Sequence, residues 1–267
     1  MNTQTLRTLV SAVVLSLVFF AVVMGVSMTF VMFNARWSPD LVWFPAPVIA
    51  VLVGSIYWAE QRWHIGLSNP VDVPWGRVYA IGIALTVLGV CVAATQGMFT
   101  GKIRATEVYG GDVSPLFQMT YAFVMSVFAA ILAEATFRGI MQTRMHAVLS
   151  LWPTVVTVAV INLLAHRWGP ELVQNWFGTL IILAAWTYLR WLSQSLWPPL
   201  IVHGLCNLIF AIAVWFNGPI VYAELSGGTI VLIVAAGLVA LVVTVFLARD
   251  LHQARLTAAG LSEQRPL

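Results

Sequence analysis

Hydrophobic positions along the chain fall into eight long blocks that are separated by short polar breaks. Each block has roughly twenty residues, the length that a helix needs to cross about 30 Å of hydrocarbon. Lipid offers no water to satisfy backbone groups, which favours helices, and the alternating pattern of membrane barrel strands is missing from the sequence. The blocks run over residues 8–33, 41–59, 78–99, 115–139, 152–168, 172–191, 197–216 and 228–248.

This pattern predicts an all-α integral membrane protein with about eight transmembrane helices. No break is long enough to separate domains, so residues 1–248 are expected to form a single polytopic membrane domain. Residues 249–267 are more polar and are expected to form a cytoplasmic tail. The stretch 60–77 is too polar to span and is expected to lie on the cytoplasmic surface.

The distribution of cations predicts the orientation, because cytoplasmic loops are enriched in Lys and Arg. With eight helices and both termini cytoplasmic, the inner side collects nine arginines and the outer side four cations. This layout predicts a multi-pass protein of the cell membrane, of the bacterial inner-membrane type. The inner set is Arg7, Arg62, Arg77, Arg138, Arg144, Arg190, Arg249, Arg255 and Arg265, and the outer set is Arg36, Lys102, Arg104 and Arg167.

Composition excludes several other classes of protein. Hydrophobic residues make up 60% of the 267 residues and charged residues 9%, far below the quarter that is usual in soluble domains. The net charge of +3 comes from cations scattered singly between apolar blocks, which argues against a nucleic-acid partner. Cys91 and Cys206 lie inside apolar blocks, and no spacing typical of a Cys/His zinc cluster is present. Membrane lipids are the expected surroundings.

Three of the blocks carry pairs of polar residues at a spacing of four. Ionisable groups inside a span are costly and mark functional sites by default. Residues four apart share one helix face, so each pair avoids lipid only by facing the interior of the bundle, where the three pairs are expected to meet. The pairs are Glu134 with Arg138, Asn162 with His166, and His203 with Asn207.

These positions resemble the motifs of the CPBP family of intramembrane proteases, which is named for CAAX proteases and bacteriocin-processing enzymes and is also called the Abi family. The run 133–139, AEATFRG, is similar to its EExxxR motif, His166 to the histidine of FxxxH, and 203–207, HGLCN, to HxxxN. The resemblance covers about 130–212 and implies a CPBP-like core over about 115–216. Two positions depart from the pattern: Ala133 replaces the first glutamate, and Asn162 replaces the phenylalanine.

The residue types suit water activation without a metal. Glu134, with Arg138 beside it, is expected to act as general base, and His203 and Asn207 are expected to hold the developing oxyanion. His166 is expected to orient the water or share its proton. The alternative is a catalytic zinc ion on Glu134, His166 and His203, because two histidines and one glutamate suit zinc with an open position. The metal-free mechanism is favoured, with no cofactor.

The leading prediction is therefore an intramembrane endopeptidase that cleaves a membrane-associated protein or a C-terminal peptide segment. Two alternatives stay open. One is a catalytically impaired relative that acts as a membrane scaffold, supported by Ala133, and the other is a small transporter or proton relay. The same residues also have structural interpretations: a sealing ion pair for Glu134 and Arg138, and hydrogen bonds between helices for the asparagines.

Overall fold

A computed structural model describes residues 3–68, 70, 73–104, 109–166 and 170–258; the side chains of residues 104, 166, 170–173, 175, 256 and 258 fall outside this description. Every predicted apolar block forms a helix. The helices are α1 (Thr3–Trp37), α2 (Pro45–Trp63), α3 (Trp75–Thr100), α4 (Pro115–Ala133), η1 (Glu134–Met141), α5 (Gln142–His146), α6 (Leu151–His166), α7 (Pro170–Ser193), α8 (Trp197–Asn217) and α9 (Gly227–Ala258), with a short 3₁₀ turn η2 (Tyr222–Glu224) before α9.

The fourth block continues beyond its predicted end and changes its helical form. The hydroxyl of Ser114 accepts a hydrogen bond from the Phe117 amide and Pro115 opens the helix, a normal helix start. From Glu134 to Met141 the segment is a π-helix, in which each bond spans five residues. π-helical turns are rare overall, but those that occur are often found at functional sites. Glu134–Met141 is therefore a candidate part of such a site.

Within the described residues, five helical segments are long and apolar enough to cross a membrane, so the chain is a multi-pass membrane protein by this criterion. They are Thr3–Trp37, Trp75–Thr100, Pro115–His146, Trp197–Asn217 and Gly227–Arg255. A shorter apolar helix covers Leu151–Ala165. The helices of all eight blocks are therefore present, whereas spanning by all eight of them stays a prediction.

The described part of the chain also contains one small β-ladder, which the all-helical prediction did not include. Strand β1 (Ile103–Arg104) pairs antiparallel with β2 (Ile220–Val221), and Ile103 lies opposite Val221. The ladder joins the connection after α3 to the connection after α8. Two residues per strand could not be distinguished from loop by sequence periodicity.

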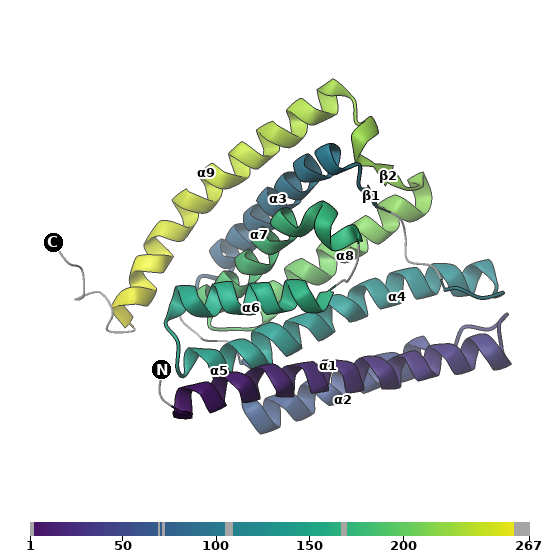
Figure 1. Ribbon diagram of the computed structural model, residues 1–267, viewed down its shortest axis with the longest axis horizontal. Coiled ribbons are helices and arrows are strands. Elements are labelled where there is room, and N and C mark those ends of the chain that lie inside the picture. The colour runs from purple at the N-terminus through teal and green to yellow at the C-terminus, as the bar shows by residue number, and fades with distance from the viewer. Residues whose placement is uncertain (1–2, 69, 71–72, 105–108, 167–169, 259–267) are drawn as a thin grey trace.

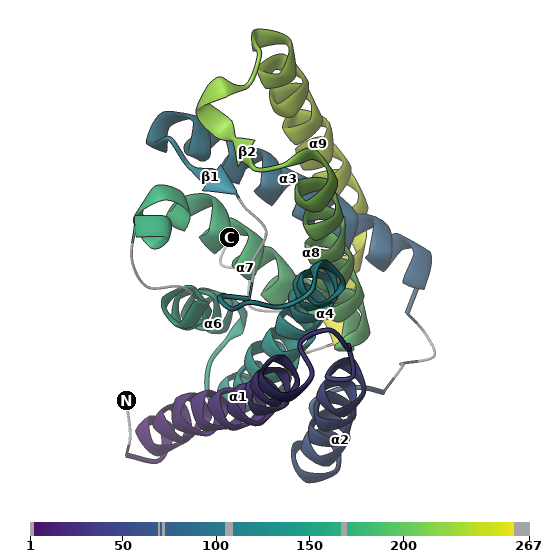
Figure 2. The same ribbon diagram turned by 90° about the vertical axis from the view of Figure 1, so that its right-hand side faces the viewer.

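The helices form two outer layers with a central group between them. Helices α1 and α2 pack together on one side, and α9 packs along α3 on the other (Figure 1). Between them lie α4, α6, α7 and α8, as the view turned by 90° shows (Figure 2). The start of α1 and the end of α9 lie at the same end of the molecule (Figure 1). Which side of the membrane this end faces stays a prediction.

The segment after α2, which was predicted to lie on the cytoplasmic surface, packs partly into the protein, and its place relative to the membrane stays a prediction. Ile65 is fully buried and packs against Gly139 of η1. The carboxylate of Glu60 accepts hydrogen bonds from the Gly66 and Leu67 amides, and the Gly66 carbonyl accepts one from the Leu196 amide. The backbone of Gly66 and Leu67 is therefore hydrogen-bonded within the protein, and Ile65 fills part of the core.

Helices α3 and α7 approach each other closely because small residues line their contact. A Cβ atom added at Gly178 would lie 2.4 Å from the Cα of Ala93, which is backbone and cannot turn aside. The Gly178 amide also donates to Oε1 of Gln96 at 3.0 Å. Small residues allow such backbone approach between membrane helices.

We predict that Gly178→Val destabilises the protein by about 1–3 kcal/mol, because the branched side chain forces α3 and α7 apart. Thermal unfolding in detergent measures the effect. Gly25→Ala in α1 is the matched control, since a Cβ there meets nothing within 4 Å. An unchanged midpoint for Gly178→Val would show that the two helices are not in close contact.

Candidate active site

The candidate site begins with an ion pair inside the π-helix. Nη1 of Arg138 lies 3.3 Å from Oε1 of Glu134, and neither side chain is exposed to solvent. The residues stand four apart, as the sequence pattern required for a shared face. Two opposite charges that are buried together avoid the large penalty of an isolated buried charge.

His203 completes this pair from the neighbouring helix α8. Its Nδ1 lies 2.7 Å from Oε1 of Glu134, a short hydrogen bond of the kind formed with charged groups. The His203 ring is almost completely buried. Helices α4 and α8 pack against each other, and the turn containing Pro198 and Pro199 opens α8. Glu134, Arg138 and His203, three of the five predicted catalytic residues, are therefore in direct contact.

Helix α7 contributes groups that sequence reasoning missed. Nη2 of Arg138 donates to the Leu183 carbonyl at 2.8 Å. One turn later, the indole of Trp186 stacks on the His203 ring with centroids 3.8 Å apart and planes 25° apart. The Arg138 guanidinium carbon lies 5.8 Å from the same indole. Within an apolar block, nothing in the pattern distinguished Trp186 from tryptophans that face lipid.

Asn207 lies on the same face of α8 as His203 but has a different partner. Its Nδ2 donates to the Ser126 carbonyl of α4 at 3.2 Å. Ser126 precedes Glu134 by about two helical turns, and Asn207 is one turn, about 6 Å, from His203 along α8. The Asn207 amide therefore joins α8 to α4 one helical turn away from His203 and is not part of the ion pair.

The third predicted polar pair lies on α6. Asn162 is fully buried there. His166 is the last residue of α6, and its side chain lies outside the described residues. Among the side chains that the structure describes, no group of three or more His, Cys, Asp and Glu residues could hold a metal ion. Because one ligand of the zinc alternative is His166, both that alternative and the metal-free expectation stay predictions.

The polar stripe of the π-helix continues through Gln142, which was also not predicted. Gln142 follows Arg138 by four residues, is buried, and donates to the Thr187 carbonyl of α7 at 2.9 Å. Its Nε2 lies 3.2 Å from Nε2 of His146, a further four residues along. Backbone carbonyls of α7 thus accept a hydrogen bond from each of Arg138 and Gln142, which attaches η1 and α5 to α7.

Ala133, the position that departs from the motif, faces a separate apolar cluster. It is buried with residues of α1, η1, α5 and α6, which fill the space between these helices. The cluster contains Ala12, Ala133, Phe137, Met141, Met145 and Val158. A carboxylate at residue 133 would therefore enter apolar surroundings, whereas the carboxylate of Glu134 meets Arg138 and His203.

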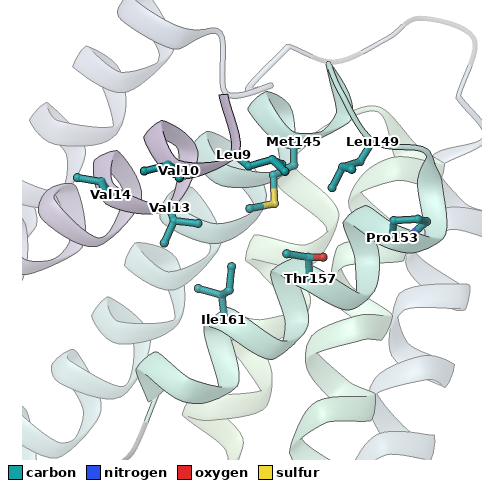
Figure 3. A pocket seen from close by; sticks show the side chains of 9 residues that line it. All are labelled: Leu9, Val10, Val13, Val14, Met145, Leu149, Pro153, Thr157 and Ile161. Carbon is teal, nitrogen blue, oxygen red and sulfur yellow. The ribbon is translucent and has the colours of Figure 1, made fainter. Parts of the chain in front are cut away.

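An open apolar groove of about 440 Å³ lies beside this cluster, between α1 and the segments around α5 and α6 (Figure 3). Met145 lines the groove and also belongs to the cluster. None of the predicted site residues lines it. Its lining residues are Leu9, Val10, Val13, Val14, Met145, Leu149, Pro153, Thr157 and Ile161.

Comparison with known proteins places this constellation in a family segment. Residues 115–209 match the family described as Type II CAAX prenyl endopeptidase Rce1-like. The matched segment covers less than half of the chain and contains Glu134, Arg138, His203 and Asn207. The resemblance inferred from the motifs is thereby confirmed. No curated protein and no solved structure matches the chain.

We predict that Arg138→Met destabilises the protein by about 3–5 kcal/mol, because it leaves the Glu134 carboxylate buried without its counter-charge. Adding Glu134→Gln to Arg138→Met should restore part of the loss, since the amide carries no charge. Chemical or thermal unfolding in detergent measures both. Asp250→Asn is the control, because its ion pair with Arg77 is exposed and should contribute about 0–1 kcal/mol. Equal losses for the Arg138 and Asp250 variants would contradict the buried pair.

Proposed function

We propose that this chain is an intramembrane endopeptidase in which Glu134 activates a water molecule for attack on a peptide bond. The observation that carries the proposal is the buried contact of the Glu134 carboxylate with both His203 and Arg138. These contacts lie within the segment that matches the prenyl endopeptidase family. A carboxylate held by a histidine and a cation inside a bundle is an arrangement suited to general-base chemistry.

The two oxygens of Glu134 have different surroundings. Oε1 contacts Nδ1 of His203 and Nη1 of Arg138, whereas buried Oε2 has no hydrogen-bond partner among the described residues. Burying a carboxylate oxygen without a hydrogen-bond partner costs free energy, so we expect a bound water molecule to donate a hydrogen bond to Oε2. We assign Oε2 the role of accepting the proton from that water as its oxygen attacks the scissile carbonyl carbon.

The remaining groups support the negative charge and the leaving amine. With Nδ1 of His203 engaged by Glu134, Nε2 is the nitrogen left to face the substrate, and it donates to the oxyanion when the ring is protonated. The Asn207 amide has a second N–H besides the one that reaches Ser126, and it can serve the same oxyanion. The proton taken by Glu134 then passes to the amine as the C–N bond breaks.

The family description names the class of substrate that we propose for this chain. A CAAX prenyl endopeptidase acts on a lipid-modified C-terminal peptide, which fits the prediction of a membrane-associated partner. Since Glu134 and Arg138 are fully buried, such a peptide reaches the carboxylate only after the helices around it separate. We therefore propose that binding and helix opening are coupled.

We predict that Glu134→Gln lowers cleavage at least about 10²-fold, because an amide cannot accept the proton from water. Purified protein in liposomes is given a farnesylated CAAX peptide in water enriched in ¹⁸O, and mass spectrometry follows the new carboxylate. One ¹⁸O atom per product identifies hydrolysis. Glu224→Gln, on an exposed glutamate outside the matched segment, is the control and should cleave normally. Cleavage by Glu134→Gln at the wild-type rate refutes the assignment.

A second candidate function rests on Ala133. Ala133 packs among the apolar residues of its cluster, which offer no polar side chain to a carboxylate. The family motif nevertheless has glutamate at this position, and its replacement supports a catalytically impaired relative that acts as a membrane scaffold. In that case the wild-type chain is inactive towards peptides, and the contacts of Glu134 serve stability alone.

Ala133→Glu separates the two functions, with Ala133→Gln as a control of similar size and no charge. If the chain is an enzyme built on Glu134, we expect wild-type cleavage and no gain from Ala133→Glu, which should instead lower the unfolding midpoint by placing a charge among apolar residues. Peptide cleavage and thermal unfolding are measured together. An inactive wild type and an active Ala133→Glu variant would establish the impaired relative instead.

A further inference from the structure

Trp186 contacts two side chains of the site, His203 and Arg138. Its indole stacks on the His203 ring at 3.8 Å between centroids and lies 5.8 Å from the guanidinium carbon of Arg138. All three side chains are buried. A flat aromatic face at this distance restricts the imidazole to one plane, because tilting the ring out of that plane brings its atoms into the indole.

Trp186 is itself fixed by a helix that contributes no ionisable group to the site. Its Nε1–H donates to Oγ1 of Thr86 on α3 at 2.9 Å. The Thr86 hydroxyl donates in turn to the Gly82 carbonyl at 2.9 Å, so that an oxygen lone pair is left to accept from the indole. Thr86 and Trp186 are both buried, which strengthens the bond between them. A chain of contacts thus runs from the α3 backbone to the imidazole.

We propose that Trp186 is a positioning residue that fixes the plane of the His203 ring and so keeps Nδ1 on Glu134, the hydrogen bond that sets the tautomer, and that Thr86 fixes Trp186. The proposal rests on the proposed function, in which His203 must present Nε2 to the substrate while Nδ1 stays with Glu134. The charged groups facing His203 among the described residues are Glu134 and Arg138, both on η1. They set the charge around the ring but do not fix its plane, which leaves that role to the indole.

Kinetic variants distinguish positioning from simple packing. Trp186→Leu removes the aromatic face and should lower kcat about 10²-fold with KM changed less than about threefold, as expected when a reacting group is displaced by about 1 Å. Trp186→Phe keeps the face but loses the indole N–H and should lower kcat only about fivefold. If Trp186 positions the His203 ring, kcat of Trp186→Phe should be closer to the wild-type value than kcat of Trp186→Leu is.

A double-mutant cycle tests the anchor. Thr86→Val removes the acceptor and nearly keeps the shape of the side chain, so it should lower kcat about as much as Trp186→Phe does. In the Trp186→Phe background it should have no further effect, because the hydrogen bond is already absent. Trp215, which packs on Phe123 near the other end of α8 from His203, supplies the control. Trp215→Leu should leave kcat unchanged.

Histidine ring ¹⁵N NMR gives a second readout that needs no substrate. Comparison with His203→Gln assigns the His203 signals, and wild type should show one tautomer, protonated at Nδ1. In folded Trp186→Leu we expect a mixture of tautomers, with Trp186→Phe close to wild type. If the wild-type chain cleaves nothing, the proposed function fails and these spectra alone decide the role of Trp186. Unchanged His203 signals in Trp186→Leu, or an unchanged kcat in an active enzyme, overturn the inference.

Discussion

An ionisable carboxylate deep inside a helical bundle must be matched by nearby charge and hydrogen bonds, and the centre of this protein is arranged around that requirement. Glu134 contacts Arg138 on its own helix and His203 on α8, and Arg138 also donates a hydrogen bond to the Leu183 carbonyl of α7. The carboxylate and its partner Arg138 therefore join η1, α7 and α8. In the π-helical segment that begins at Glu134, Glu134 contacts α8 and Arg138 contacts α7. Stability and the proposed chemistry consequently depend on the same contacts.

Much of the fold could be predicted from hydrophobic block length, because a helix that crosses lipid must be long, apolar and internally hydrogen-bonded. All eight blocks are helices. The features that were missed depend on contacts distant in sequence. Ile65 is buried because Gly139 leaves room for it, and the polar groups around it are satisfied by Glu60 and Leu196. The short β-ladder and the π-turn leave no periodic signal of their own.

The candidate site could be predicted where its residues are unusual for a membrane segment. Glu134, Arg138 and His203 were identified because charge in lipid is costly and because spacing places them on interior faces. Asn207 was identified for the same reason, but its partner is a backbone carbonyl, which sequence does not reveal. Trp186 was missed because an aromatic residue among apolar ones has no distinguishing pattern until the fold brings it against His203.

The distance between the His203 ring and the Glu134 carboxylate is the quantity on which the account depends most. Solid-state NMR of the protein in lipid bilayers, with ¹⁵N in histidine and ¹³C in the glutamate carboxyl groups, measures it directly, and Glu134→Gln and His203→Gln assign the signal. The account predicts a direct hydrogen bond, with Nδ1 and Oε1 2.7 Å apart. A separation beyond hydrogen-bonding range, more than about 3.5 Å between these atoms, would contradict it.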